Sequence, residues 1–303
     1  MGRRLIMKTQ KERIIQLLGM AFKSRSSTRS LAIANQILEI DSQVPEALLI
    51  KADNIDNDKE RAEILKQALD AVDNNGCIYL KDDNDLFRLV VNQRLAFNLF
   101  TLNDLDGAFT ACEKVLSSDE SLLEEFDGLQ LIKALYYRIM LARREWQKIL
   151  AETMQDSEHS PAWAYSRLIA AYMLAPGKNK KSLCAKMFWD ALIISPQIPF
   201  YMLGYAPEPD DNANTKDFDD FNFALMYYDV LSVSKDFFNW FSRGVILFGL
   251  LTNRFDAKER DYMIDAIDSL GGYEEYERMN KIIMEREDSA VIEALAAHKC
   301  LTQ

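Results

Sequence analysis

The sequence has few of the residues that interrupt helices or build chemical centres. Its 303 residues include only 11 glycines, 7 prolines, 4 cysteines and 2 histidines. The cysteines lie far apart and form no C-x-x-C pair, so the pattern predicts neither a disulfide framework nor a zinc site. We therefore expect no metal and no cofactor, with reduced thiols as is typical of a cytoplasmic protein. The cysteines are Cys77, Cys112, Cys184 and Cys300.

Long apolar runs and an excess of positive charge are also missing. The longest strongly apolar run, Val245–Leu251, is far shorter than the roughly 20 residues that span a bilayer, so we expect a buried helix there and no membrane partner. The basic start, Gly2–Arg4, precedes too short an apolar stretch for a secretory signal and is expected to be a frayed terminus. A net charge of -11 argues against nucleic acid as a partner, because that affinity depends on clustered Lys and Arg.

What the sequence does contain is abundant material for helices and a core. Hydrophobic residues make up 49% of the chain, and Leu, Ala, Glu, Lys and Met favour helix over strand. One block recurs, in which an amphipathic helix ends in an aliphatic pair, a polar residue and a turn. It is found at Ile37–Ser42, Ala68–Asp73 and Ala191–Pro196. Because a helical unit of this kind must stack on its neighbours to bury its apolar face, the pattern predicts an all-α protein, an α-solenoid of antiparallel helix hairpins.

Apolar spacing, capping residues and helix stops divide the chain into five helix pairs and a C-terminal region. The first four pairs are expected over residues 9–22 and 28–40, 47–55 and 62–72, 86–101 and 107–117, and 122–141 and 146–154, with an insertion at 77–85. The fifth pair follows Pro161, breaks at 175–177 and ends before Pro196. Further helices are expected at 221–233, 257–270, 273–287 and 289–299.

The third and fifth pairs resemble the tetratricopeptide repeat (TPR). That motif places small or medium side chains where two helices cross, because close crossing leaves no room for large ones, and larger apolar residues fill the flanking grooves. In the third pair these positions are Ala96, Ala108 and Cys112, flanked by Leu95, Leu99 and Val115. In the fifth pair, Cys184, Phe188, Ala191 and Pro196 have the spacing of the repeat's second-helix positions. The intervals between units vary, so the resemblance implies a divergent array of TPR-like repeats.

A second resemblance covers about Pro161 to Phe241. The segment Pro196–Gly204 resembles the proline-bounded aromatic stretch that follows the last repeat in the suppressor-of-tumorigenicity-seven-like TPR family, which implies an interaction role without a reaction. We expect divergent TPR-like repeats over residues 1–204, a solvated acidic loop over 205–220, and helices over 221–303 that pack on and cap the solenoid. An EF-hand is not expected in the acidic stretch, because the spacing of its aspartates lacks the required ligand pattern.

The first helix of each TPR hairpin lines the concave face, which allows a partner-binding groove to be predicted. Gln93 and Phe97 occupy the positions where related arrays carry a carboxylate clamp, so an amphipathic helix or extended peptide with apolar anchors is favoured over a terminal carboxylate. The alternative is that the aromatic residues pack between repeats. The predicted groove residues are Arg13, Gln16, Met20, Lys23, Gln93, Phe97, Phe100, Arg138, Trp163, Ser166 and Met173.

These patterns predict a non-enzymatic adaptor that binds a protein or peptide in the concave groove. A regulatory repeat protein that responds to a peptide or small ligand is the alternative. An enzymatic site around residues 201–220 is a third hypothesis, disfavoured because no nucleophile motif or phosphate-binding glycine loop occurs and both histidines, His159 and His298, are expected at the surface.

Overall fold

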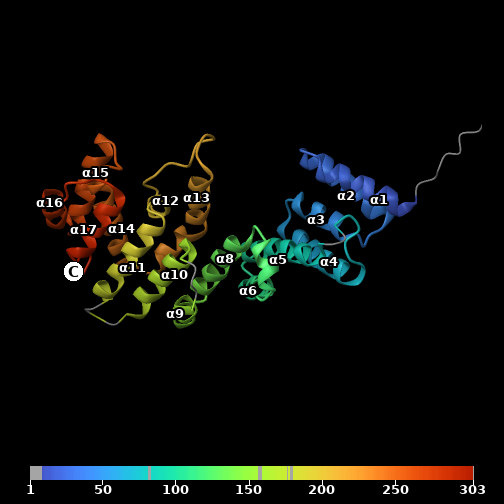
Figure 1. Ribbon diagram of the computed structural model, residues 1–303, viewed down its shortest axis with the longest axis horizontal. Coiled ribbons are helices and arrows are strands. Elements are labelled where there is room, and N and C mark those ends of the chain that lie inside the picture. The colour runs from blue at the N-terminus through green and yellow to red at the C-terminus, as the bar shows by residue number, and fades with distance from the viewer. Residues whose placement is uncertain (1–8, 81–82, 156–158, 176, 178–179, 303) are drawn as a thin grey trace, which may run out of the picture. The chain divides into compact units, whose positions relative to one another are not determined.

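The computed structural model describes residues 9–80, 83–155, 159–175, 177 and 180–302 (Figure 1). In these ranges it contains seventeen α-helices and no β-strand, which confirms the all-α expectation. The basic residues 2–4 and Pro176, in the expected break between the helices of the fifth pair, lie outside the described ranges. The chain divides into two compact units, Met1–Ile139 and Met140–Gln303.

In the first unit, each helix from α1 to α6 packs on the next one along the chain. Short turns join the partners of each hairpin, and α1 also contacts α3. The helices are α1 (Gln10–Phe22), α2 (Ser27–Ile40), α3 (Pro45–Asp53), α4 (Asp58–Asn75), α5 (Asn84–Thr101), α6 (Leu105–Leu116), α7 (Glu120–Glu124) and α8 (Leu129–Ala142), whose last residues belong to the second unit.

Local capping chemistry sets most of these boundaries. The Ser26 side chain accepts from the backbone of Arg29 at the start of α2, and Pro45 is the first residue of α3, where its missing N–H costs no helical hydrogen bond. Asn57 caps α4, which ends at Gly76 with a φ of 68°. These starts and stops were predicted from the sequence, and the structure confirms them to within a few residues.

The fourth predicted pair needs a correction. The single helix expected over 122–141 is two helices, α7 and α8, separated by residues 125–128. Phe126 is buried in this turn, and a Cβ on Gly128 would lie 2.5 Å from the amide nitrogen of Gln93. The chain therefore turns at a glycine whose backbone packs directly against α5, a contact that local helix propensity does not indicate.

The second unit combines sequential hairpins with contacts between distant segments. α10 packs on α9 and α11, whereas α17 packs on α11 and on α14. The helices are α9 (Trp146–Gln155), α10 (Pro161–Leu174), α11 (Lys180–Ile194), α12 (Ile198–Met202), α13 (Thr215–Tyr227), α14 (Lys235–Leu251), α15 (Ala257–Ser269), α16 (Tyr273–Ile282) and α17 (Asp288–Ala297), with the 3₁₀ helix η2 (Tyr228–Val233).

The core of this unit forms around α14, which is buried on all sides from Gly244 to Leu251, as the apolar run predicted. Aromatic rings from α10, α11 and α14 pack together near its first turns. The ring of Tyr172 lies 4.9 Å from that of Trp240, and Phe188 meets Phe241 edge to face at 5.4 Å. Edge-to-face pairs of this kind add stabilisation beyond the area that they bury.

The acidic segment also differs from its prediction. α13 begins at Thr215, capped by the side chain of Asn214, so the loop expected to reach residue 220 ends six residues earlier. Asp220 is buried and accepts a hydrogen bond from the hydroxyl of Ser195 at 2.5 Å. A solvated loop over the whole of 205–220 was therefore wrong, because one of its aspartates serves the packing of α13 beside the end of α11.

No helix in the described part of the chain is both long and apolar enough to cross a membrane. The four cysteine thiols are free and buried. Burial raises the pKa of Cys112 to about 12 and that of Cys184 to about 11, which keeps both in the unreactive thiol form. Both histidines are exposed, as predicted.

Candidate functional site

Four of the predicted groove residues gather on one side of α1. Arg13, Gln16, Met20 and Lys23 follow one another at helical spacing, and all four side chains are exposed. The opposite side of α1 carries the buried residues of the helix and packs on α2 and α3. The exposed stripe is thus fixed in orientation by the core on the other side of the same helix.

A cavity of about 530 Å³ opens beside this stripe. It is bounded by the exposed side of α1, the turn that follows and the first turns of α2. We call it the α1 face, and its lining residues are Gln16, Gly19, Met20, Lys23, Ser24 and Arg29. Apolar groups lie in and next to it, because Met20 is 47% exposed and Phe22 is 46% exposed. The ring of Tyr79 packs 5.5 Å from that of Phe22.

The segment that forms the α1 face is basic although the chain as a whole is strongly acidic, and two of its cations, Lys23 and Arg29, line the cavity. Between residues 9 and 31 there are five Lys or Arg residues and one acidic residue, Glu12. Glu12 is engaged in a capping box with Thr9 at the start of α1. In the described structure no carboxylate pairs with the side chain of Lys23 or Arg29. The exposed cations are Lys11, Arg13, Lys23, Arg25 and Arg29.

The groove residues predicted on α5 and α8 lie mostly inside the protein. Gln93 is buried against Gly128, and Arg138, which is only 8% exposed, places its guanidinium 5.4 Å from the centre of the Phe100 ring. Phe97 and Phe100 are half-buried. The predicted apolar wall at this point is therefore filled by the protein's own side chains, which is the alternative that the aromatic spacing left open.

The predicted groove residues on α10 are also occupied internally. The indole nitrogen of Trp163 donates to the backbone carbonyl of Thr153 at 2.7 Å, and the Ser166 hydroxyl bonds the Tyr227 hydroxyl at 3.0 Å. Both residues are buried, whereas Met173 is half-buried. The prediction that Trp163 and Ser166 face a partner is thus corrected, because their polar atoms hold α10 against α9 and α13.

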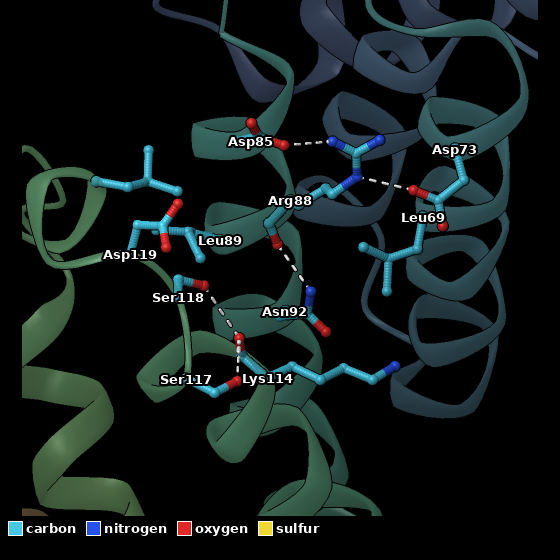
Figure 2. Close-up of a pocket in the computed structure, with 11 residues that line it drawn as sticks. Leu69, Asp73, Asp85, Arg88, Leu89, Asn92, Lys114, Ser117, Ser118 and Asp119 are labelled. Carbon is cyan, nitrogen blue, oxygen red and sulfur yellow. Dashed lines mark hydrogen bonds and ion pairs between the residues drawn. The ribbon is translucent and has the colours of Figure 1, made fainter.

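A second cavity, which the sequence did not predict, lies between α4, α5 and α6 (Figure 2). Its volume is about 510 Å³, which is within the usual range for small-molecule sites. We call it the α4–α6 cavity. It is lined by Leu69 and Asp73 of α4, by Asp85, Arg88, Leu89 and Asn92 of α5, by Lys114 of α6, and by Ser117, Ser118, Asp119 and Leu122.

Two ion pairs made by Arg88 lie at the end of this cavity that is uppermost in Figure 2. Arg88 donates through Nε to Asp73 at 2.8 Å and through Nη1 to Asp85 at 2.6 Å, as the dashed lines in Figure 2 show. The hydrogen bond to Asp73 is the main cause that raises the pKa of Arg88. Because two carboxylates already pair with this guanidinium and give the cluster a net negative charge, Arg88 joins α5 to α4 and is not free to attract an anion.

Neither cavity provides an evident centre for metal binding. In the described ranges no group of three or more His, Cys, Asp and Glu side chains is arranged to hold a metal ion. No local sequence pattern indicates the α4–α6 cavity, because separate segments of the chain form it. It also gave none for Arg29 or Tyr79, which reach the region of α1 from outside that helix.

Comparison of the chain with family models, curated proteins and solved structures finds no significant match. Membership of the TPR class, and of the suppressor-of-tumorigenicity-seven-like family, therefore stays a prediction.

Proposed function

We propose that this protein is a non-enzymatic binding protein whose α1 face holds an acidic segment of a partner protein. The observation that carries the proposal is an exposed surface of Lys and Arg around Met20 and Phe22, in a chain whose net charge is -11. Oppositely charged surfaces steer association and suppress wrong partners, while apolar anchors supply most of the binding energy.

The repeat pattern supports the same function. Consecutive packing from α1 to α6 is what a stack of TPR-like hairpins would give, and such stacks present their first helices to partners. α1 is the first helix of the first hairpin. We therefore place the partner on α1 rather than along a groove through α5 and α10, whose predicted contact residues are largely buried. We further propose that the protein acts in the cytoplasm.

The occupant that fits is a peptide with acidic residues and one or two large apolar side chains. Lys23 and Arg29 would pair with its carboxylates, and Met20 and Phe22 would contact its apolar anchor. A flexible methionine suits such a surface, because its side chain adapts to different partners. A basic or uniformly polar peptide would lack either the charge or the anchor.

Fluorescence anisotropy with labelled 12-residue peptides tests this proposal. One set mixes Glu and Asp with Leu and Phe, and a second set replaces every acidic residue by Lys. We expect the acidic set alone to bind, more weakly as salt rises, and the double variant Lys23→Gln/Arg29→Gln to bind at least about 10-fold more weakly, a loss of about 1.4 kcal/mol.

The matched control is Lys258→Gln/Lys281→Gln, which removes the same charge from exposed positions on α15 and α16. This variant should bind like the wild type. Equal binding of both peptide sets, equal loss in the control variant, or no binding of the acidic set would each refute the α1 face as the partner site.

A further inference from the structure

The α4–α6 cavity contains a buried hydrogen-bond acceptor that has no partner. Asn92 is 7% exposed, and its Nδ2 donates to the backbone carbonyl of Arg88 at 2.9 Å. Its Oδ1 accepts no hydrogen bond. In Figure 2 this oxygen points away from α5 toward the part of the cavity along which the Lys114 side chain runs. An unsatisfied buried carbonyl is costly, so a molecule that brings an N–H to it gains binding energy.

The two remaining charges of the cavity have opposite signs. Arg88 pairs with both Asp73 and Asp85, a cluster that keeps one surplus negative charge, and the charged lining residues outside this cluster are Lys114 and Asp119. Both are exposed at the rim, and in the described structure neither forms an ion pair. Figure 2 shows Asp119 on one side of the cavity and the end of the Lys114 side chain on the other. A ligand that satisfies both must carry one negative and one positive group at separate ends.

Three leucines lie among the polar side chains that line the cavity. Leu89 of α5 is buried, while Leu69 of α4 and Leu122 of α7 are half-buried. The cavity therefore presents a cation, an unpaired carbonyl oxygen and a carboxylate, together with three leucine side chains. A nucleotide would leave Asp119 without a cationic partner, and an uncharged sugar would leave both charges without a counterpart.

We propose that the α4–α6 cavity binds a dipeptide with aliphatic side chains. Its terminal carboxylate pairs with Lys114, its terminal ammonium pairs with Asp119, and its peptide N–H donates to Oδ1 of Asn92. A free amino acid lacks the peptide N–H between its two charges, so the dipeptide is the smallest peptide that satisfies all three groups. This site is separate from the α1 face and does not depend on the function proposed for it.

Isothermal titration calorimetry with L-alanyl-L-leucine tests the assignment. We expect this dipeptide to bind, and both its N-acetyl derivative and its C-terminal amide to bind at least about 10-fold more weakly, because each lacks one terminal charge. Free L-leucine should also bind at least about 10-fold more weakly. Asn92→Leu should weaken binding of the dipeptide by a similar factor.

The charge assignments are tested by pairing variants with derivatives. Lys114→Met keeps the aliphatic stem and should bind the dipeptide and its amide equally, whereas Asp119→Asn should no longer distinguish the dipeptide from its N-acetyl form. Both side chains are exposed, so neither change disturbs folding. Lys66→Met, on α4 but outside the cavity, is the control and should retain both preferences.

The proposal is overturned if L-alanyl-L-leucine gives no binding heat up to millimolar concentration, or if both blocked derivatives or free leucine bind as tightly as the dipeptide. It is also overturned if Lys114→Met keeps the preference of the wild type for the free carboxylate. Binding that depends on Lys23 and Arg29, and not on Lys114, would assign the dipeptide to the α1 face and equally refute this site.

Discussion

The carboxylate of Glu46 accepts a hydrogen bond from the backbone N–H of Tyr79 at 2.7 Å, across 33 positions of the chain. The same oxygen accepts from Ile78 at 2.7 Å and from Leu80 at 3.2 Å. Glu46 lies on α3 and is fully buried, so this single side chain holds the start of the insertion at 77–85 against α3. The insertion in turn places the ring of Tyr79 beside Phe22, next to the α1 face.

Replacing Glu46 by Ala should destabilise the first unit strongly. Three backbone N–H groups would lose their acceptor, and we expect the free energy of unfolding to fall by about 3 kcal/mol. Urea denaturation measures this loss. Amide hydrogen exchange at Ile78 and Tyr79 should also become faster, because the segment would no longer be held.

Glu39→Ala is the matched control, since Glu39 is an exposed glutamate on α2. Its effect should stay within about 0.5 kcal/mol. If Glu46→Ala proved equally mild, the three hydrogen bonds would not anchor the insertion.

Substitution by alanine should lower the free energy of unfolding at Gly244 and raise it at Gly19. A Cβ on Gly244 would lie 2.7 Å from the Leu301 side chain and 2.9 Å from the Phe188 ring, so Gly244→Ala should destabilise by about 1–3 kcal/mol through overpacking. At Gly19, in the middle of α1, a Cβ would meet only the Tyr79 ring at an ordinary 3.6 Å. There Ala should stabilise by about 0.5–1 kcal/mol, because glycine is a poor helix former.

Thermal unfolding of the two alanine variants beside the wild type decides this prediction. The melting temperature should fall for Gly244→Ala and rise for Gly19→Ala. Two shifts of the same sign would mean that helix propensity alone, or packing alone, governs both positions.

Local signals account for what the sequence predicted well. The Ser26 and Asn57 caps, Pro45 at a first helical position and the stop at Gly76 each act within a few residues, so they can be recognised from the chain alone. The Asn214 cap was also present in the sequence, but the surrounding acidic residues outweighed it and the start of α13 was placed too late.

The predicted groove depended on information that no local pattern carries. Spacing placed Trp163 and Ser166 on one side of a helix, but their burial is decided by α9 and α13, which pack over that side. The four residues on α1 remained exposed, since the described helices cover only its other side. The α4–α6 cavity could not be predicted at all, because Asn92 is an ordinary helical residue until α4 and α6 enclose it.

Asp220 should make the stability of the second unit depend on pH. Burial raises the pKa of its carboxyl above the ordinary value of 3.8, despite the hydrogen bond from Ser195. Since the folded chain then binds this proton more tightly than the unfolded chain does, the stability that Asp220 contributes is present at low pH and is lost as the pH rises through the raised pKa.

Asp220→Asn removes the titration, so its stability relative to wild type should improve between pH 4 and pH 7. Urea midpoints across this interval measure the difference, and Asp211→Asn, an exposed aspartate in the loop before α13, should follow the wild-type slope. Parallel slopes for wild type and Asp220→Asn would show that the buried carboxyl titrates normally.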